Sequence, residues 1–108
     1  MTVKELCEKC GYEALCVSNP DREVKGGYAG DLLSWVMGRA GADQAWITIM
    51  SNRNIVAVAT LADTACILLA EGVAPDEGVA QLAADKGINL LTCSTGAYEL
   101  ALELSKCL

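Results

Sequence analysis

A three-layer α/β/α domain with a small, mainly parallel sheet is the fold class that the sequence predicts, and three observations predict it. Apolar residues make up 53% of the chain, which contains no Phe and only two Trp, so Ala, Val, Leu and Ile must build the core. Short continuous apolar runs alternate with helical patterns, as in parallel sheets that are covered on both faces. The length of 108 residues suits a single domain over residues 1–108.

The first half of the chain alternates between helical and extended patterns. The apolar residues of segment 3–10 have helical spacing and lie on one face of a short helix, which ends at a glycine. Residues 14–17 form a short apolar run. The turn-forming and glycine residues of segment 19–30 predict a loop, and a second helix follows from Asp31. Residues 45–50 are the clearest strand, because they are rich in β-branched and aromatic side chains.

The second half repeats this alternation. Residues 53–62 predict a helix that is apolar nearly all round, so we expect it to be buried, and residues 65–69 predict a strand. Pro75-Asp76 is expected to start a helix that Gly87 closes, and residues 88–91 form the third strand. Ser94-Thr95 is expected to cap a last helix with a regular apolar stripe.

Composition excludes several classes of function. The formal net charge is −6, and the eight basic residues are scattered among fourteen acidic ones, which argues against nucleic acid as a partner. No apolar run approaches the roughly eighteen residues that cross a bilayer, and no signal peptide is visible. We therefore expect a cytoplasmic protein without a membrane partner, whose six cysteines are thiols. The absence of histidine removes the usual general base, so no catalytic residue and no cofactor are predicted.

The carboxyl ends of the strands are the expected binding edge, because the strand-to-helix loops of such folds gather there. The loops that qualify are residues 19–30, 51–54, 71–72 and 93–96, and they hold basic side chains, hydroxyls and helix starts that suit a phosphate or a carboxylate. The candidate ligand-binding residues are Asp21, Arg22, Gly26, Gly27, Tyr28, Asp31, Asn52, Arg53, Asn54, Thr92, Ser94 and Thr95. The alternative is that these residues are helix caps, turns and local ion pairs. Asp21 and Asp31 could also coordinate Mg²⁺, although turn and cap roles explain both.

The segment Asp21-Arg22-Glu23-Val24-Lys25-Gly26-Gly27-Tyr28-Ala29-Gly30-Asp31-Leu32-Leu33-Ser34 resembles the signature of the DRTGG domain family. Further matches run in order through residues 46–49, 54–59, 71–76 and 87–92, so the resemblance covers essentially the whole chain. In this sequence Glu23-Val24-Lys25 separates Arg22 from Gly26, so the motif behind the family's name is spread out.

The resemblance implies a three-layer α/β domain that is often dimeric and regulatory. Such domains occur within phosphotransacetylases and CBS-domain pyrophosphatases, and they are similar to the N-terminal domain of the HPr kinase/phosphorylase. Small free-standing members occur near hydrogenase or redox-partner genes. A kinase activity does not follow from this, because the sequence lacks the Gly-x-x-x-x-Gly-Lys-Ser/Thr string that holds phosphates in P-loop kinases.

The spacing Cys7-x2-Cys10-x5-Cys16 is the pattern that could carry metal or redox chemistry, with Cys66, Cys93 or Cys107 as a fourth ligand. Packing is the favoured interpretation, because Cys7 and Cys10 share the apolar face of the first helix. Cys93 is the thiol expected to be most reactive. Trp46 and Tyr98 are expected in the core or in a dimer interface.

Three functions follow from these observations. The first is a non-catalytic regulatory domain that binds a small anionic or nucleotide-like ligand at the carboxyl edge of the sheet. The second is a homodimeric adaptor that binds a protein partner through residues 53–62 or the aromatic positions, in a redox or hydrogenase system. The third and weakest is a cysteine-based metal or redox protein.

Overall fold

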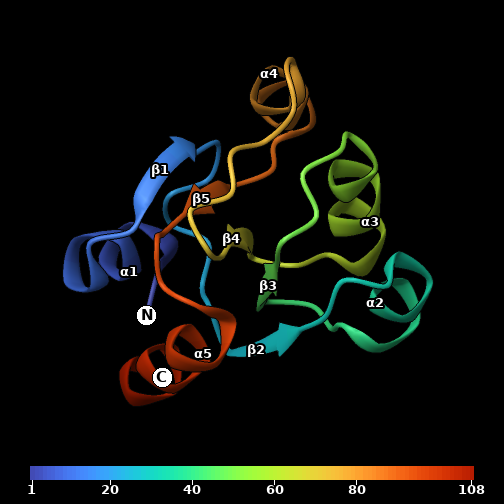
Figure 1. The fold of residues 1–108 in the computed structure, drawn as a ribbon. Coiled ribbons are helices and arrows are strands. Elements are labelled where there is room, and N and C mark those ends of the chain that lie inside the picture. Colours follow the sequence, from blue (N-terminus) through green and yellow to red (C-terminus); the bar gives the residue numbers. More distant parts are fainter.

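A five-stranded sheet with helices on both faces is the architecture of the computed structural model, which describes residues 1–108 (Figure 1). The elements in chain order are α1 (Val3–Cys10), β1 (Glu13–Cys16), β2 (Gly26–Ala29), α2 (Leu33–Arg39), β3 (Gln44–Thr48), α3 (Asn54–Ala62), β4 (Cys66–Leu69), α4 (Val79–Lys86), β5 (Leu90–Thr92) and α5 (Ala97–Cys107). The strand order is β1-β5-β4-β3-β2. All neighbouring strands are parallel except β1, which runs antiparallel to β5. The predicted fold class is confirmed.

Each face of the sheet packs against its own helices (Figure 1). Successive side chains of a strand point to opposite faces, so Leu68 belongs to one core and Ile67 and Leu69 to the other. The first core contains buried residues of α1 and α5, and the second contains those of α2, α3 and α4. β4 lies at the centre of the sheet and its four residues are all buried, which explains why it reads as a continuous apolar run.

The helix ends follow local sequence rules where caps are present. Thr2 accepts a hydrogen bond from the Glu5 N–H, and the Glu5 carboxylate accepts one from the Thr2 N–H, so α1 begins with a capping box. These hydrogen bonds lower the pKa of Glu5. Gly11 ends α1 with a φ of 72°, a left-handed conformation that glycine adopts without a steric cost. None of the helices is long and apolar enough to cross a membrane.

The largest departure from the sequence prediction lies in residues 19–30, which were expected to form one loop. Gly26–Ala29 instead forms the edge strand β2, which pairs in parallel with β3. Two glycines in four residues hide this strand, because glycine is depleted in strands and packs no side chain. The residues before Gly26 therefore lie at the amino edge of the sheet, and only those after Ala29 lie at the carboxyl edge.

Three smaller expectations are also wrong. α3 is buried on one face only, and Leu61 at its end is 72% exposed. α4 begins at Val79, after Gly78, and not at Pro75-Asp76. The N-cap of α5 is Gly96, with no side-chain capping hydrogen bond, so neither hydroxyl of Ser94-Thr95 caps that helix.

Candidate functional site

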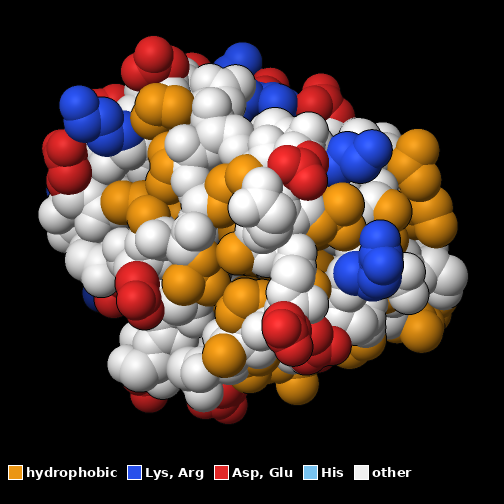
Figure 2. All heavy atoms as spheres, turned by 90° about the horizontal axis from the view of Figure 1, so that it is seen from above, with side chains coloured by type: hydrophobic (Ala, Val, Ile, Leu, Met, Phe, Trp, Pro, Cys, Tyr) orange, Lys and Arg blue, Asp and Glu red, His pale blue; other side chains and the backbone are white.

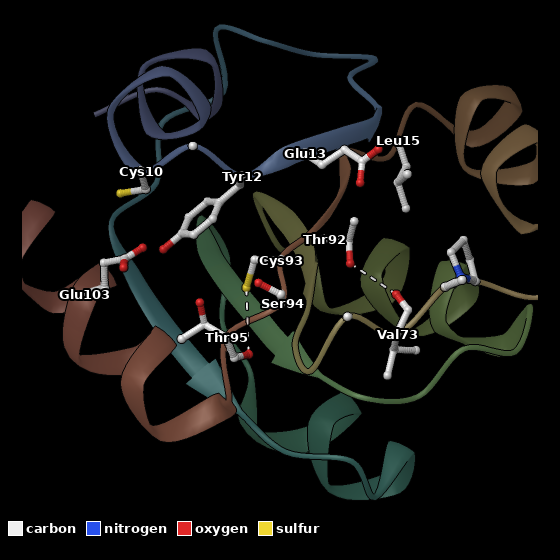
Figure 3. A pocket seen from close by; sticks show the side chains of 14 residues that line it. Cys10, Tyr12, Glu13, Leu15, Val73, Thr92, Cys93, Ser94, Thr95 and Glu103 are labelled. Carbon is white, nitrogen blue, oxygen red and sulfur yellow. Dashed lines mark hydrogen bonds between the residues drawn. The ribbon is translucent and has the colours of Figure 1, made fainter.

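A cavity of about 660 Å³ opens at the carboxyl ends of β4 and β5 (Figure 3). Its walls come from residues 10–13 and Leu15, from the loop 72–75, from residues 92–95 and from Glu103 of α5. Residues 10–15 reach this edge because β1 is antiparallel and Glu13 pairs with Thr92. The volume is in the range of small-molecule sites, and the position is the one where α/β folds bind their ligands.

Tyr12 is the most unusual residue of this cavity. Its side chain is 6% exposed, and its buried hydroxyl has no hydrogen-bond partner. Figure 3 shows the ring between Cys10 and Cys93, with the hydroxyl directed toward Glu103. Burial raises the pKa of this hydroxyl, and the nearby Glu103 carboxylate raises it further. Tyr12 is therefore a protonated donor at neutral pH, and a buried polar group without a partner is costly in a folded protein.

The hydroxyls on the opposite wall differ in whether they already form hydrogen bonds within the protein. The Thr92 hydroxyl donates to the Val73 carbonyl oxygen at 3.1 Å, so it is engaged within the protein. The hydroxyls of Ser94 and Thr95 make no hydrogen bond in the structure, because Gly96 and not either of these residues is the N-cap of α5. Both hydroxyls are free to bind a ligand. The expectation that Ser94-Thr95 caps α5 is therefore wrong.

The charged side chains that line the cavity are both carboxylates, Glu13 and Glu103, and no Lys or Arg is among the lining residues. The N-terminus of α5 is also beside a carboxylate, because a Cβ on Gly96 would lie 3.4 Å from the Glu71 Oε1. Glu71 thus already supplies the negative charge that a helix N-terminus attracts. The cavity therefore suits groups that donate hydrogen bonds, and it offers no cationic partner to a phosphate.

Arg22 lies at the opposite, amino edge of the sheet. Its Nε and Nη2 each lie 2.9 Å from the Asp43 Oδ1, and Nη2 is 3.1 Å from the Asp63 Oδ1 and 2.7 Å from the Asp63 carbonyl oxygen. Asp43 and Asp63 precede β3 and β4. These carboxylates and hydrogen bonds outweigh partial burial and raise the pKa of Arg22. The expectation that Arg22 faces a ligand at the carboxyl edge is wrong, because the formation of β2 places this arginine at the other edge.

Gly27 of β2 packs beside α5, whereas the Tyr28 side chain packs against the core under α2, α3 and α4. A Cβ on Gly27 would lie only 2.9 Å from the Leu104 Cδ2, so close helix–strand packing explains this glycine. Gly26 and Tyr28 also line a groove between β2 and α5, away from the cavity. Asp21 is an exposed turn residue before the strand.

The remaining predicted residues lie near β3 and α3. The Asp31 carboxylate accepts hydrogen bonds from the Thr48 hydroxyl at 2.8 Å and from the Ile49 N–H at 3.0 Å, so it joins two loops at the carboxyl edge. The Asn52 side chain accepts from the Asn54 N–H at 2.9 Å. Arg53 and Asn54 line a groove between α3 and α4. Of the twelve predicted residues, the cavity brings together Thr92, Ser94 and Thr95.

The structure separates the cysteines of the C-x2-C-x5-C pattern. Cys7 and Cys10 pack against the core under α1 and α5, whereas Cys16 packs against the core on the other face. No group of three or more Cys, Asp or Glu side chains is arranged to hold a metal ion. Cys10 instead meets Cys107, with 3.3 Å between the two Sγ atoms. Tyr98 is 77% exposed and is not part of the core, whereas Trp46 is fully buried.

Sequence reasoning missed Cys10, Tyr12, Glu13 and Glu103 as cavity residues. The first three lie before or at the start of β1, whose antiparallel direction no local pattern reveals, and Glu103 lies on the apparently solvated side of a helix. The signal available in the sequence was a tyrosine directly after the helix-ending Gly11, since tyrosine is usually placed where its hydroxyl finds a partner.

Comparisons with known proteins complete this description. A protein-family model, the DRTGG domain, matches residues 33–107, which include only the last two residues of the segment 21–34. Among solved structures, the chain is similar to the CBS and DRTGG domains of the regulatory region of Clostridium perfringens pyrophosphatase, complexed with an activator, diadenosine tetraphosphate. The TM-score is 0.66 and the identity 12%, over 95% of this chain and 45% of that chain. No curated protein matches the chain.

Proposed function

This chain belongs to the DRTGG domain family, and we propose that it is a non-catalytic regulatory domain that binds a nucleotide-like ligand in the cavity at the carboxyl edge. The observation that carries the proposal is the buried Tyr12 hydroxyl, which lies in the cavity wall directed toward Glu103 and makes no hydrogen bond of good geometry within the protein. A bound ligand that accepts a hydrogen bond from this hydroxyl removes the cost of leaving it unpaired.

The chemistry of the walls favours the nucleoside end of such a ligand. Glu13 and Glu103 accept hydrogen bonds from ribose hydroxyls or from an exocyclic amine, and Ser94 and Thr95 can donate or accept. Apolar side chains from Leu15, Val73 and Pro75 offer a surface for a base. A phosphate gains little here, because the lining side chains include no cation. We therefore place the phosphates outside the cavity, in water.

A structural neighbour with a bound nucleotide supports this proposal. The pyrophosphatase regulatory region was solved with a nucleotide activator, diadenosine tetraphosphate. This chain spans 45% of that protein's chain, so nucleotide binding by this domain is part of the proposal. A non-catalytic role agrees with the lack of histidine, and six unpaired thiols suit a reducing cytoplasm.

Ligand panels separate nucleoside recognition from phosphate recognition. Thermal shift and calorimetry would be run with adenosine, AMP, ATP, diadenosine tetraphosphate and pyrophosphate. A ligand at a hundredfold its Kd should stabilise the fold by about 2.7 kcal/mol. We expect stabilisation by adenosine and its nucleotides and none by pyrophosphate. Binding of pyrophosphate without adenosine, or no response to any compound, would refute the proposal.

Variants then locate the site. Ser94→Ala and Thr95→Val each remove one free hydroxyl and should weaken adenosine binding roughly threefold to tenfold, the effect of one hydrogen bond. Ser105→Ala is the matched control, because this serine bonds the Leu102 carbonyl oxygen on α5 and does not line the cavity. Equal loss of affinity in the control variant would place binding elsewhere.

A second candidate function is a homodimeric adaptor over the same domain, residues 1–108. The observation that favours it is the exposure of large apolar side chains, with Leu32, Trp35 and Leu61 on and beside α2 and α3 at 58%, 53% and 72%. Figure 2 shows hydrophobic side chains among basic ones on the right of the face seen from above. Light scattering across a wide concentration range tests this candidate, and a strictly monomeric protein would contradict it.

A further inference from the structure

We propose that Cys10 and Cys107 form a reversible disulfide through exchange with a small-molecule disulfide, so that this pair is a redox modification site of the domain. The two Sγ atoms lie 3.3 Å apart although the residues are 97 positions apart in the chain. Cys10 is the last residue of α1 and Cys107 is the last residue of α5. Both side chains are partly exposed, so a small reagent can reach them.

The contact distinguishes Cys10 and Cys107 from the other thiols, and no hydrogen bond is found for the Cys7 thiol. Cys66 is fully buried, and Cys16 has the Ser18 hydroxyl and the Ile88 carbonyl oxygen as its contacts. The Cys93 thiol faces the Thr95 carbonyl oxygen at 3.9 Å. Cys10 and Cys107 are the thiols in sulfur-to-sulfur contact. Closing a disulfide needs an S–S bond of about 2.05 Å, and Cys107 is the last residue of its helix, where a small displacement disturbs little.

The disulfide forms in two thiol–disulfide exchange steps. The thiolate of one cysteine attacks a sulfur of the disulfide RSSR, which gives a mixed disulfide and releases RS⁻. The second cysteine, as a thiolate, then attacks the protein sulfur of the mixed disulfide and releases the second RS⁻. The protein loses two electrons and two protons, and RSSR becomes two RSH. Burial and the hydrogen bond with Cys107 raise the pKa of Cys10 to about 11, so the exchange should accelerate as the pH rises.

The modification site adjoins the cavity. Cys10 lines the cavity beside Tyr12, and Glu103 precedes Cys107 by four residues on α5, so Glu103 and Cys107 share one face of that helix. Drawing the two sulfurs together moves the Cys10 thiol relative to Tyr12 and Glu103. The disulfide should therefore alter ligand affinity, a consequence that rests on the proposed function, whereas the disulfide itself does not.

Oxidation of the intact protein tests the site directly. The reduced protein would be equilibrated with glutathione disulfide, its free thiols alkylated, and its peptides mapped by mass spectrometry. We expect a cross-link between the peptides of Cys10 and Cys107 within one chain, and a Tm raised by about 10 °C. Dithiothreitol should reverse both changes. Cys107→Ser should abolish the cross-link, and Cys93→Ser, which alters another partly exposed thiol of the cavity, should retain it.

Three results would overturn the proposal. They are stable glutathione adducts on Cys10 or Cys107 without a cross-link, cross-links between chains, and a cross-link to another cysteine. The wild-type peptide map gives this answer even if a variant fails to fold. Ligand binding is measured separately on the reduced protein, so a failure of the proposed function is distinguishable from a failure of the disulfide.

Discussion

Tyr12→Phe should stabilise the ligand-free protein while weakening its binding of adenosine. The hydroxyl is buried and unpaired, and leaving a buried polar group unsatisfied costs about 1–3 kcal/mol. Phenylalanine keeps the ring in the same contacts with the core under α1 and α5. We expect a gain of about 1 kcal/mol in the free energy of unfolding, which corresponds to a Tm increase of about 5 °C in a domain of this size.

Thr64→Val is the matched control for this prediction. The Thr64 hydroxyl is the other buried hydroxyl without a partner, and the residue is 5% exposed. Thr64 precedes β4 and lies at the amino edge, outside the cavity. Valine has the same shape, so this variant should also gain about 1 kcal/mol but should bind adenosine like the wild-type protein.

Urea unfolding gives the stability of both variants, and calorimetry with adenosine gives their affinity. The reasoning requires that stability and binding separate, because both variants gain stability and only Tyr12→Phe loses affinity. A Tyr12→Phe protein that is less stable than wild type would refute it, since the hydroxyl would then already have a partner in solution. Unchanged affinity in Tyr12→Phe would refute the assignment of the site.

Three further predictions concern the rest of the fold. Arg22→Met should lower the free energy of unfolding by about 1 kcal/mol in urea unfolding, because the partly buried Asp43 and the exposed Asp63 lose their charge partner. Gly27→Val should lower the free energy of unfolding by about 1–3 kcal/mol, because it forces Leu104 out of place. Gly26→Val should be tolerated, because a Cβ there would have no neighbour closer than 3.8 Å. The Tm values of the two variants distinguish these outcomes. Burial raises the pKa of Cys66 from 9.0 to about 12, so its stabilising contribution is complete below pH 9 and is lost at about 1.4 kcal/mol per pH unit as the pH rises toward 12. Stability measured from pH 8 to 11 should fall less steeply in Cys66→Ala, although partly exposed thiols such as Cys10 keep some slope, and an unchanged slope would contradict the assignment.

The fold was predictable because its central strands and helices carry strong local patterns. β4 lies between two neighbours and two helical layers, so all four of its residues are apolar. β2 was not predictable in this way. It is an edge strand whose Gly27 makes room for Leu104 of α5, and glycines that close packing requires look in a sequence like the glycines of a loop.

The candidate site was predictable only in its location and in one of its walls. The rule that ligands lie at the carboxyl ends of parallel strands led to Thr92, Ser94 and Thr95. The opposite wall comes from the one strand that runs the other way. Because an antiparallel β1 places its first residues at that edge, Tyr12 and Glu13 become site residues through topology alone.

Arg22, which was wrongly expected at the carboxyl edge, is connected to the cavity through the segment before β2 and through α1. Its ion pairs hold the segment before β2 against the starts of β3 and β4, and the same segment holds α1, since the Val3 N–H donates to the Arg22 carbonyl oxygen at 2.9 Å and the Lys4 N–H donates to that of Pro20 at 3.0 Å. α1 in turn ends at the cavity, where Cys10 lies next to the wall formed by Tyr12. These contacts connect Arg22, at the opposite edge of the sheet, to the cavity wall through α1, and Arg22 itself does not line that cavity.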